Sequence, residues 1–173
     1  MSPNKDIRIV LTGFMGVGKS TVARHLAQLA DAKKVDLDQA LESFEKRAVA
    51  EIIDELGIQE FRRIETSALA RVLADPGVRI LSLGGGTWTM LENRELIRES
   101  GFTSVWLEST FEHCWLNIAF SRKQRPLARS KEDARRLFEE RQKDYCLADW
   151  HFIIKPDQTS HGVALQIYEE IFF

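Results

Sequence analysis

The stretch Ile7–Ser20, with the sequence IRIVLTGFMGVGKS, decides the fold of this chain. Its first part, 7–12, is a short apolar run with β-branched residues, which predicts a buried strand. Its second part satisfies the pattern GxxxxGK(S/T), and from Lys19 onward apolar residues recur at helical spacing. Strand, glycine-rich loop and helix in this order predict a phosphate-binding loop. The alternative, a glycine-rich turn with a chance lysine, is the weaker interpretation.

The glycines of this loop allow successive backbone N–H groups to converge on phosphate oxygens, and the following helix adds the positive end of its dipole. Lys19 would neutralise the β- and γ-phosphates, and the hydroxyl of Ser20 would ligate Mg²⁺. The loop therefore predicts binding of a nucleoside triphosphate. It leaves open whether the phosphate passes to water, to a small molecule or to a nucleotide.

Length and composition fit one globular domain over 1–173, because 44% of the residues are hydrophobic and 29% are charged. Lys and Arg number 24 against 26 Asp and Glu, and the net charge of −2 disfavours a nucleic-acid partner. No apolar run approaches the ~18 residues that span a bilayer, and none precedes Ile7, so we expect neither a membrane span nor a signal peptide. Cys114 and Cys146 predict reduced thiols of a cytoplasmic protein.

The rest of the chain alternates strand and helix patterns. Further strands are predicted at 34–38, 78–83, 104–107 and 152–154, and helices at about 39–56, 58–73, 92–99 and 163–171. Two more helices are predicted to begin at capping boxes, at Ser109–Glu112 and at Ser130–Asp133. Alternation of this kind implies an α/β fold with a parallel sheet covered on both faces. The basic segment 120–130 lacks periodicity and predicts a flap.

Asp36 and Asp38 stand two residues apart at the end of the second predicted strand. If both belong to the strand, they face the same side, at the edge where parallel sheets bind ligands. One carboxylate would then hold hydrated Mg²⁺, and the other would take a proton from an attacking hydroxyl. The alternative is a solvated turn in which Asp38 caps the next helix.

Two arginines are predicted to point inward as receptors for an anion. Arg62 stands three residues before Glu65, which lies on or beside the apolar stripe of its helix. Arg141 shares one face of its helix with apolar side chains. A guanidinium can bind a carboxylate or a phosphate through two parallel hydrogen bonds. The alternative for each arginine is a surface position with the stem over the core.

Arg125, in the basic flap, is expected to swing onto the transferring phosphate as the flap closes; a solvated basic loop is the alternative. Gly84–Gly86 follows the third strand and would let a ligand approach the backbone closely, unless it is merely a flexible turn. Ser82 is a candidate to support the water shell of the metal. Trp88 and Trp106 are predicted to be core aromatics.

Taken together, these segments resemble the shikimate kinase family over about 7–145. The matching pieces are GFMGVGKST at 13–21, DLD at 36–38, GIQEFRRIE at 57–65, LSLGGG at 81–86, RPL at 125–127, and Arg141 with Tyr145. The resemblance implies a three-layer P-loop kinase fold around a five-stranded parallel sheet, with a lid at about 120–130 and a substrate-binding region at about 37–65. It also implies a monomeric enzyme that transfers the γ-phosphate of ATP to the 3-hydroxyl of shikimate, a step towards chorismate and the aromatic amino acids.

The resemblance assigns roles residue by residue. ATP would be bound by Arg125 and by the loop residues Gly13, Met15, Gly16, Val17, Gly18, Lys19, Ser20 and Thr21, and Mg²⁺ by Ser20 and Asp36. Shikimate would be bound by Asp38, Arg62, Gly84, Gly85, Gly86 and Arg141, with Glu65 orienting the arginines. The catalytic residues would be Lys19, Arg125 and the base Asp38.

The chain departs from the family pattern at four places. Ile58 stands where glutamate is usual, the glycine expected near Lys46 is absent, and Ala128 follows the RPL segment in place of leucine. Ile118 stands where an arginine usually packs on adenine, and Arg122 is a candidate to replace that arginine. Two alternatives therefore stay open: a kinase of another small carboxylated polyol, and an ATP-binding module without turnover.

Overall fold

The computed structural model describes residues 3–123 and 125–173. In this part of the chain five strands form one sheet: β1 (Ile9–Thr12), β2 (Lys33–Asp36), β3 (Val78–Ser82), β4 (Thr103–Glu108) and β5 (Trp150–Ile153). Their order is β2-β3-β1-β4-β5, and every pairing is parallel. The predicted five-stranded parallel sheet is confirmed, with the strand before the glycine-rich loop at its centre.

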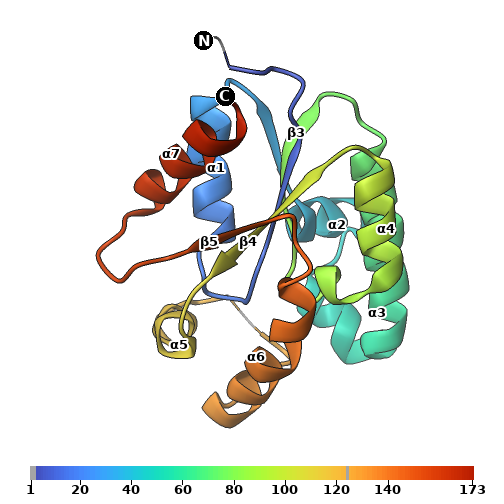
Figure 1. Ribbon diagram of the computed structural model, residues 1–173. Coiled ribbons are helices and arrows are strands. Elements are labelled where there is room, and N and C mark those ends of the chain that lie inside the picture. The colour runs from blue at the N-terminus through green and yellow to red at the C-terminus, as the bar shows by residue number, and fades with distance from the viewer. Residues whose placement is uncertain (1–2, 124) are drawn as a thin grey trace.

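Helices cover both faces of the sheet. They are α1 (Lys19–Leu29), α2 (Leu37–Glu45), α3 (Val49–Leu73), α4 (Leu91–Glu99), α5 (Phe111–Ala119), α6 (Lys131–Tyr145) and α7 (Ser160–Ile171). Figure 1 shows α1 and α7 on one side of the sheet and α3 and α4 on the other. Because β1 is covered on both faces, Ile9, Val10 and Leu11 are completely buried, as the continuous apolar run predicts. Trp88 and Trp106 are also buried, as predicted.

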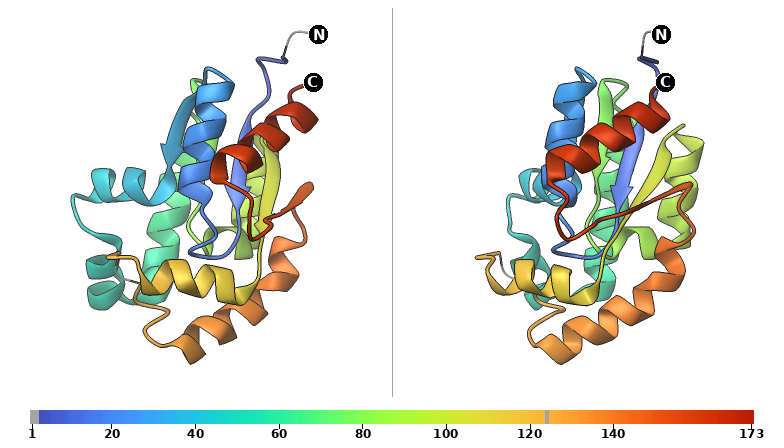
Figure 2. Two further views of the ribbon diagram at one scale, coloured as in Figure 1. Left: turned by 90° about the vertical axis from the view of Figure 1, so that its left-hand side faces the viewer. Right: turned by 60° about the vertical axis from the view of Figure 1, so that its left-hand side comes forward.

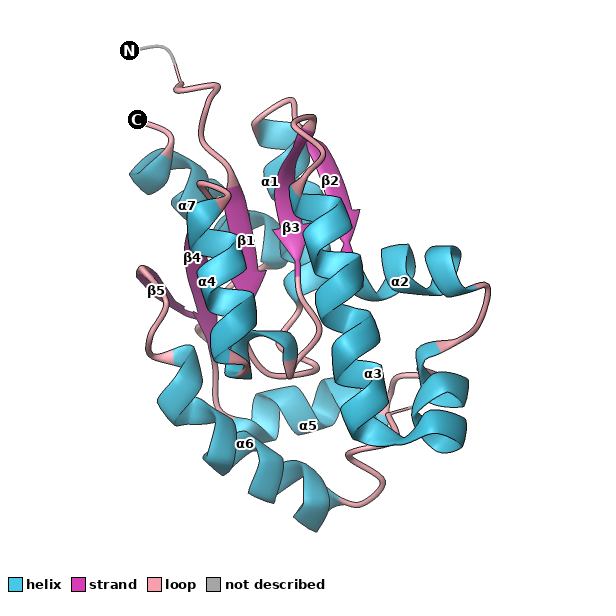
Figure 3. Cartoon of the chain, turned by 90° about the vertical axis from the view of Figure 1, so that its right-hand side faces the viewer, coloured by secondary structure: helices cyan, strands magenta, loops and turns pink. Residues whose placement is uncertain are grey.

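The carboxyl ends of the strands point toward α5 and α6 (Figures 2 and 3). The sheet order reverses at β1, whose neighbours β3 and β4 both follow it in the chain. Open parallel sheets bind ligands outside the carboxyl ends of their strands at such a point. The glycine-rich loop after β1, the start of α2 after β2 and the glycine triplet after β3 all lie at this edge.

The boundary between β2 and α2 differs from the prediction. The strand ends at Asp36, and Asp38 lies in the first turn of α2. Asp36 is the N-cap, because its Oδ1 accepts a hydrogen bond from the N–H of Gln39 at 3.2 Å. The prediction that both aspartates belong to one strand is therefore wrong, and so is the alternative that Asp38 is the cap. The first carboxylate is therefore the cap of the helix, and the second lies within its first turn.

Three other boundaries depend on local backbone conformation. The single helix predicted over 39–56 is wrong, because the chain turns at Lys46, whose φ is 57°, before α3 begins. The break predicted between 56 and 58 is confirmed, since Gly57 has φ 81° and ψ 168° inside α3. The cap of α5 is Thr110 rather than Ser109, whereas the predicted cap Ser130 is confirmed.

Arg8 connects several elements at the amino-terminal ends of the strands, on the side of the sheet away from the glycine-rich loop. Its guanidinium donates hydrogen bonds of 3.0 to 3.2 Å to four backbone carbonyls, those of Leu73, Asp75, Val78 and Ser100. These carbonyls lie at the ends of α3 and α4 and at the start of β3, where backbone acceptors lack helical partners. The guanidinium carbon also lies 4.1 Å from the ring centroid of Phe102. One side chain therefore joins three elements.

We expect Arg8→Met to lower the free energy of unfolding by about 2–3 kcal/mol, since the variant leaves several partly buried carbonyls without a charged donor. Arg8→Lys should recover less than half of this loss, because an ammonium cannot reach four acceptors in one plane. Urea unfolding measures both. Arg136→Met, which removes an exposed arginine paired with Asp133, should change stability by less than about 0.5 kcal/mol. Equal effects at the two positions would contradict the role of Arg8.

Candidate active site

The glycine-rich loop wraps around the start of α1 and packs against α5. Gly16 has φ 82°, and a Cβ at this position would collide with the carbonyl oxygen of Cys114 in α5. Gly13 has φ 138°, and its Cβ would lie 2.6 Å from the carbonyl oxygen of Leu107. Larger residues cannot bring the backbone this close. The close packing holds the loop so that α1 begins at Lys19.

Lys19 is buried at the base of this loop. Its Nζ donates to the carbonyl oxygens of Gly13 at 2.7 Å and Phe14 at 3.1 Å. Burial removes water from the ammonium and lowers the pKa of Lys19 to about 8, against the opposing attraction of Asp38. An anion bound to the loop would restore the charged form.

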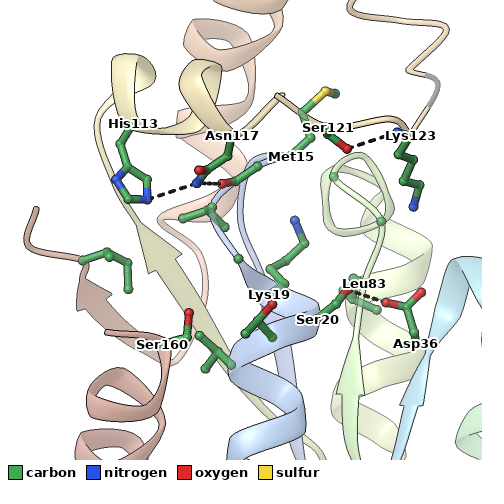
Figure 4. A pocket seen from close by; sticks show the side chains of 18 of the residues that line it. Met15, Lys19, Ser20, Asp36, Leu83, His113, Asn117, Ser121, Lys123 and Ser160 are labelled. Atoms are coloured by element: carbon green, nitrogen blue, oxygen red, sulfur yellow. Dashed lines mark hydrogen bonds between the residues drawn. The ribbon is translucent and has the colours of Figure 1, made fainter. Parts of the chain in front are cut away.

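Asp36 receives two hydroxyl donors in addition to its cap bond. Ser20 Oγ donates to Asp36 Oδ2 at 2.6 Å (Figure 4), and Ser82 Oγ donates to the same oxygen at 3.0 Å. Burial opposes ionisation of Asp36, but the hydrogen bonds from Ser20, the Gln39 N–H and Ser82 together hold its pKa below the usual value. This carboxylate is therefore kept charged beside the phosphate-binding loop.

The oxygen donors of Ser20 and Asp36 suit Mg²⁺. The described residues contain no group of three or more His, Cys, Asp or Glu side chains that could hold a metal ion. Mg²⁺ is commonly bound through one or two protein oxygens together with substrate phosphates and water, so the sparse donor set fits this ion.

Two adjoining cavities open at the carboxyl edge of the sheet. The first, of about 470 Å³, is lined by the glycine-rich loop, Asp36 and residues of α5 and α7. The second, of about 290 Å³, is lined by α3, the glycine triplet, Pro126, Leu127 and Arg141. The residues common to both are Met15, Asp38, Gly84, Gly85, Lys123 and Arg125. A nucleotide in the first cavity and a small molecule in the second would meet at this junction.

Arg62 lines the second cavity, and the buried Glu65 holds its guanidinium through an ion pair. Glu65 is only 1% exposed; its Oε2 accepts from Arg62 Nη1 at 2.6 Å, and its Oε1 accepts from Thr87 Oγ1 at 2.7 Å. Burial raises the pKa of Glu65, against the opposing effects of Arg62 and Thr87. A Cβ at Gly86 would collide with the guanidinium of Arg62, so glycine leaves the space that the guanidinium occupies. The glutamate fixes one side of the guanidinium and leaves the other free to bind.

Arg141 and Arg125 present buried donors to the second cavity. Among the described residues, neither Arg141 Nη1 nor Arg125 Nε has a hydrogen-bond acceptor. A buried cationic N–H without an acceptor is costly, so these two donors fit an anionic ligand. Tyr145 lies beside Arg141 and donates to the carbonyl oxygen of Gly85; burial raises its pKa to about 12, which keeps the hydroxyl protonated.

The structure brings together the residues that the sequence singled out. Around the first cavity it places Met15, Gly16, Val17, Gly18, Lys19, Ser20, Thr21 and Asp36; around the second, Arg62, Gly86 and Arg141; and at the junction, Asp38, Gly84, Gly85 and Arg125. Gly13 is the first residue of the loop, and its carbonyl oxygen accepts the hydrogen bond from Lys19. The roles of these residues in binding and catalysis remain predictions.

Sequence reasoning missed several residues of the site. His113 and Asn117 of α5 line the first cavity, and Asn117 Nδ2 donates to the carbonyl oxygen of Gly16 at 2.7 Å (Figure 4). Lys123 lies at the junction. Ile118 is buried against Gly16 and helps to hold the loop, whereas Arg122 is exposed and lies outside the described lining of the cavity. The polar face of α5 was the available signal for Asn117, which stands four residues after His113.

No helix in the part of the chain that the structure describes is long and apolar enough to cross a membrane.

Comparison with known proteins gives a consistent result. The family model for shikimate kinase matches residues 15–172. A shikimate kinase of Caulobacter vibrioides is 38% identical over 170 residues, which cover 96% of this chain and 82% of the relative. A shikimate kinase of Brucella canis is 32% identical over 164 residues, which cover 93% and 80%.

A solved structure agrees with the sequence matches. Shikimate kinase from Acinetobacter baumannii, in complex with shikimate, superposes with a TM-score of 0.85 at 29% identity, covering 98% of this chain and 92% of that one. The match to the family model begins within the phosphate loop, at residue 15, and spans both cavities and the lid segment. On these grounds, the chain belongs to the shikimate kinase family.

Proposed function

We propose that the protein transfers the γ-phosphoryl group of ATP to the 3-hydroxyl of shikimate, which yields shikimate 3-phosphate and ADP. The observation that carries the proposal is the junction of a phosphate-binding cavity with a second cavity that presents Arg62 and Arg141 to an anion. Membership of the family and the shikimate-bound relative favour shikimate over another carboxylated polyol. They also favour an enzyme over an ATP-binding module without turnover.

The first cavity provides the phosphate site. The loop N–H groups and Lys19 would hold the phosphates of ATP, with Arg125 reaching the γ-phosphate from the lid. Ser20 and Asp36 would hold Mg²⁺, which would neutralise charge on the β- and γ-phosphates. Because these side chains come from α1, from the lid and from the end of β2, they hold the transferring group in one orientation.

The second cavity orients the acceptor. Arg62 and Arg141 would bind the carboxylate of shikimate, and the backbone at Gly85 would contact its ring substituents. The 3-hydroxyl would then lie at Asp38. Its oxygen forms a bond to the γ-phosphorus, the bond from that phosphorus to the β–γ bridging oxygen breaks, and the hydroxyl proton passes to the Asp38 carboxylate.

We propose a monomer as the active unit, as the resemblance to the family implies. The net charge of −2 gives no support for a nucleic-acid partner. We also propose a cytoplasmic location, consistent with a substrate and a cofactor that are small soluble molecules.

The function is tested by ATP consumption with purified protein and Mg²⁺ over a panel of shikimate, quinate, gluconate and nucleoside monophosphates. We expect rapid consumption with shikimate alone. Stronger activity with gluconate or quinate would assign another carboxylated polyol. Tight ATP binding without turnover on any member of the panel would assign a binding module.

Lys19→Met should lower kcat at least about 10²-fold with the fold intact, because the loop backbone remains while a charge at the γ-phosphate is lost.

Lys19→Met should also change the pH dependence of the free energy of unfolding. Lys19 holds its proton less tightly when folded, with a pKa of about 8 against 10.5, so the parent gains stability as pH rises between these values. Relative to Lys19→Met, this gain should reach up to about 3 kcal/mol in urea unfolding. A difference between the two proteins that is independent of pH would contradict the assignment.

Arg62→Ala or Arg141→Ala should weaken shikimate binding by about 2–5 kcal/mol and leave ATP binding nearly unchanged, because each change removes a charged partner of a desolvated carboxylate. Arg62→Lys should not rescue binding fully, since an ammonium lacks the planar fork. Calorimetric titration with each ligand measures both affinities. Arg63→Ala, at a neighbouring side chain that is 82% exposed, is the matched control and should change neither. Loss of ATP affinity alone would reverse the assignment of the two cavities.

Asp36 and Asp38 can be separated by a Mg²⁺ titration at saturating ATP and shikimate. Asp36→Asn should raise the Mg²⁺ concentration needed for half activity, because Asp36 acts through the metal. Asp38→Asn should lower kcat by about 10²–10⁴-fold without rescue by Mg²⁺, since an amide cannot accept the proton. Rescue of Asp38→Asn together with no rescue of Asp36→Asn would invert the assignment.

A further inference from the structure

Lys123 lies at the junction of the two cavities, beside the residue proposed as the base. Its Nζ is 3.0 Å from Oδ2 of Asp38, and its side chain lines both cavities. The contact connects the segment between α5 and α6 with the first turn of α2. Neither the motifs of the sequence nor the proposed mechanism gives Lys123 a role.

The local backbone holds Lys123 in this orientation. The backbone N–H of Lys123 donates to Ser121 Oγ at 3.1 Å (Figure 4), and this hydrogen bond closes a short turn within the lid. The Lys123 side chain is 52% exposed and that of Asp38 is 21% exposed. An ion pair with this exposure contributes little to the stability of a fold. Stability is therefore a weak reason for a lysine at the centre of the site.

Charge at the junction gives a stronger reason. Asp38 is the principal anion that attracts both Lys19 and Arg125, and it is also hydrogen bonded to Lys123. Lys19 and Lys123 also attract the neighbouring carboxylate Asp36, so three cations face two carboxylates, an excess of positive charge that suits a transferring phosphoryl group. While Nζ of Lys123 donates to Oδ2, it occupies one acceptor position of the Asp38 carboxylate. Movement of Lys123 to another anion would free that position for a substrate hydroxyl.

We propose that Lys123 is a second catalytic cation of the lid, which binds Asp38 before the substrates enter and binds the γ-phosphoryl oxygens during transfer. This inference rests on the proposed function, and it adds no bond change to the transfer described above. Lys123 and Arg125 neutralise the transferring group from the lid, while Lys19 does so from the loop. The exchange also frees Oδ2 of Asp38 at the moment when the phosphate arrives.

The test compares Lys123→Met with Lys131→Met, since Lys131 also pairs with a single carboxylate, Glu112, at 3.1 Å but lies at the start of α6. We expect Lys123→Met to lower kcat for shikimate phosphorylation about 10²-fold. The KM for shikimate should change by less than about 3-fold, as expected for a contact made only in the transition state. Lys123→Arg should retain more activity than Lys123→Met, and Lys131→Met should behave like the parent.

A second measurement separates catalysis from structure. ADP with aluminium fluoride and shikimate mimics the transferring phosphoryl group, and Lys123→Met should weaken this complex about 10²-fold while ADP alone binds as in the parent. Equal weakening of both complexes would mean a structural role and would overturn the proposal. A kcat for Lys123→Met equal to that of Lys131→Met would overturn it, and so would a higher kcat, which would make the ion pair an inhibitory contact.

The proposed function is judged separately, by whether the parent phosphorylates shikimate at all. If it does not, the same variants are compared in ATP hydrolysis, where water replaces the hydroxyl and the transferring group carries the same charge. A slower hydrolysis in Lys123→Met than in Lys131→Met would then support the role of Lys123, and equal rates would overturn it.

Discussion

Burial of positive charge at the carboxyl edge of the sheet is the constraint on which the rest of the site depends. Lys19 and Arg141 are less than 10% exposed, and buried donors of Arg125 and Arg141 lack acceptors among the described residues. Such groups are costly to place in a protein interior unless an anion completes their hydrogen bonds. The parallel sheet makes the arrangement possible, because it brings the ends of β1, β2 and β3 to one edge. Phosphate and carboxylate ligands then provide the missing charge.

The acids of the site are arranged so that they do not neutralise these cations completely. Glu65 accepts a hydrogen bond from Arg62 with one carboxylate oxygen and from Thr87 with the other. It therefore positions the guanidinium of Arg62 without covering it. Asp36 receives two serine hydroxyls and a helix N–H, which keep it ionised without a direct lysine or arginine partner in its hydrogen bonds. Asp38 is left as the acid that faces several cations, which suits a group that must handle a proton.

The sequence was sufficient to predict the sheet and the loop, because the apolar run of β1 and the glycines after it leave few alternatives. Boundaries were predicted less well where two side chains compete for one cap. Asp36 rather than Asp38 caps α2, and Thr110 rather than Ser109 caps α5. In each pair only the final backbone geometry decides which side chain is the cap. The inward arginines were predicted from their helix faces. Lys123 was missed because its partner Asp38 is 85 residues away in the chain, a distance over which no local pattern operates.

Gly57 divides the long helix α3 into two parts that line the second cavity with different kinds of side chain. Its φ of 81° and ψ of 168° form a combination that is essentially restricted to glycine. Before this break, Val49 and Ile53 line the second cavity with apolar side chains. After it, the ion pair of Arg62 and Glu65 gives the lining its charge. Substitutions in the first part can therefore reshape the cavity without moving the arginine. The shape of the cavity and its charge are thus set by separate parts of one helix, so a substitution can alter the first and leave the second in place.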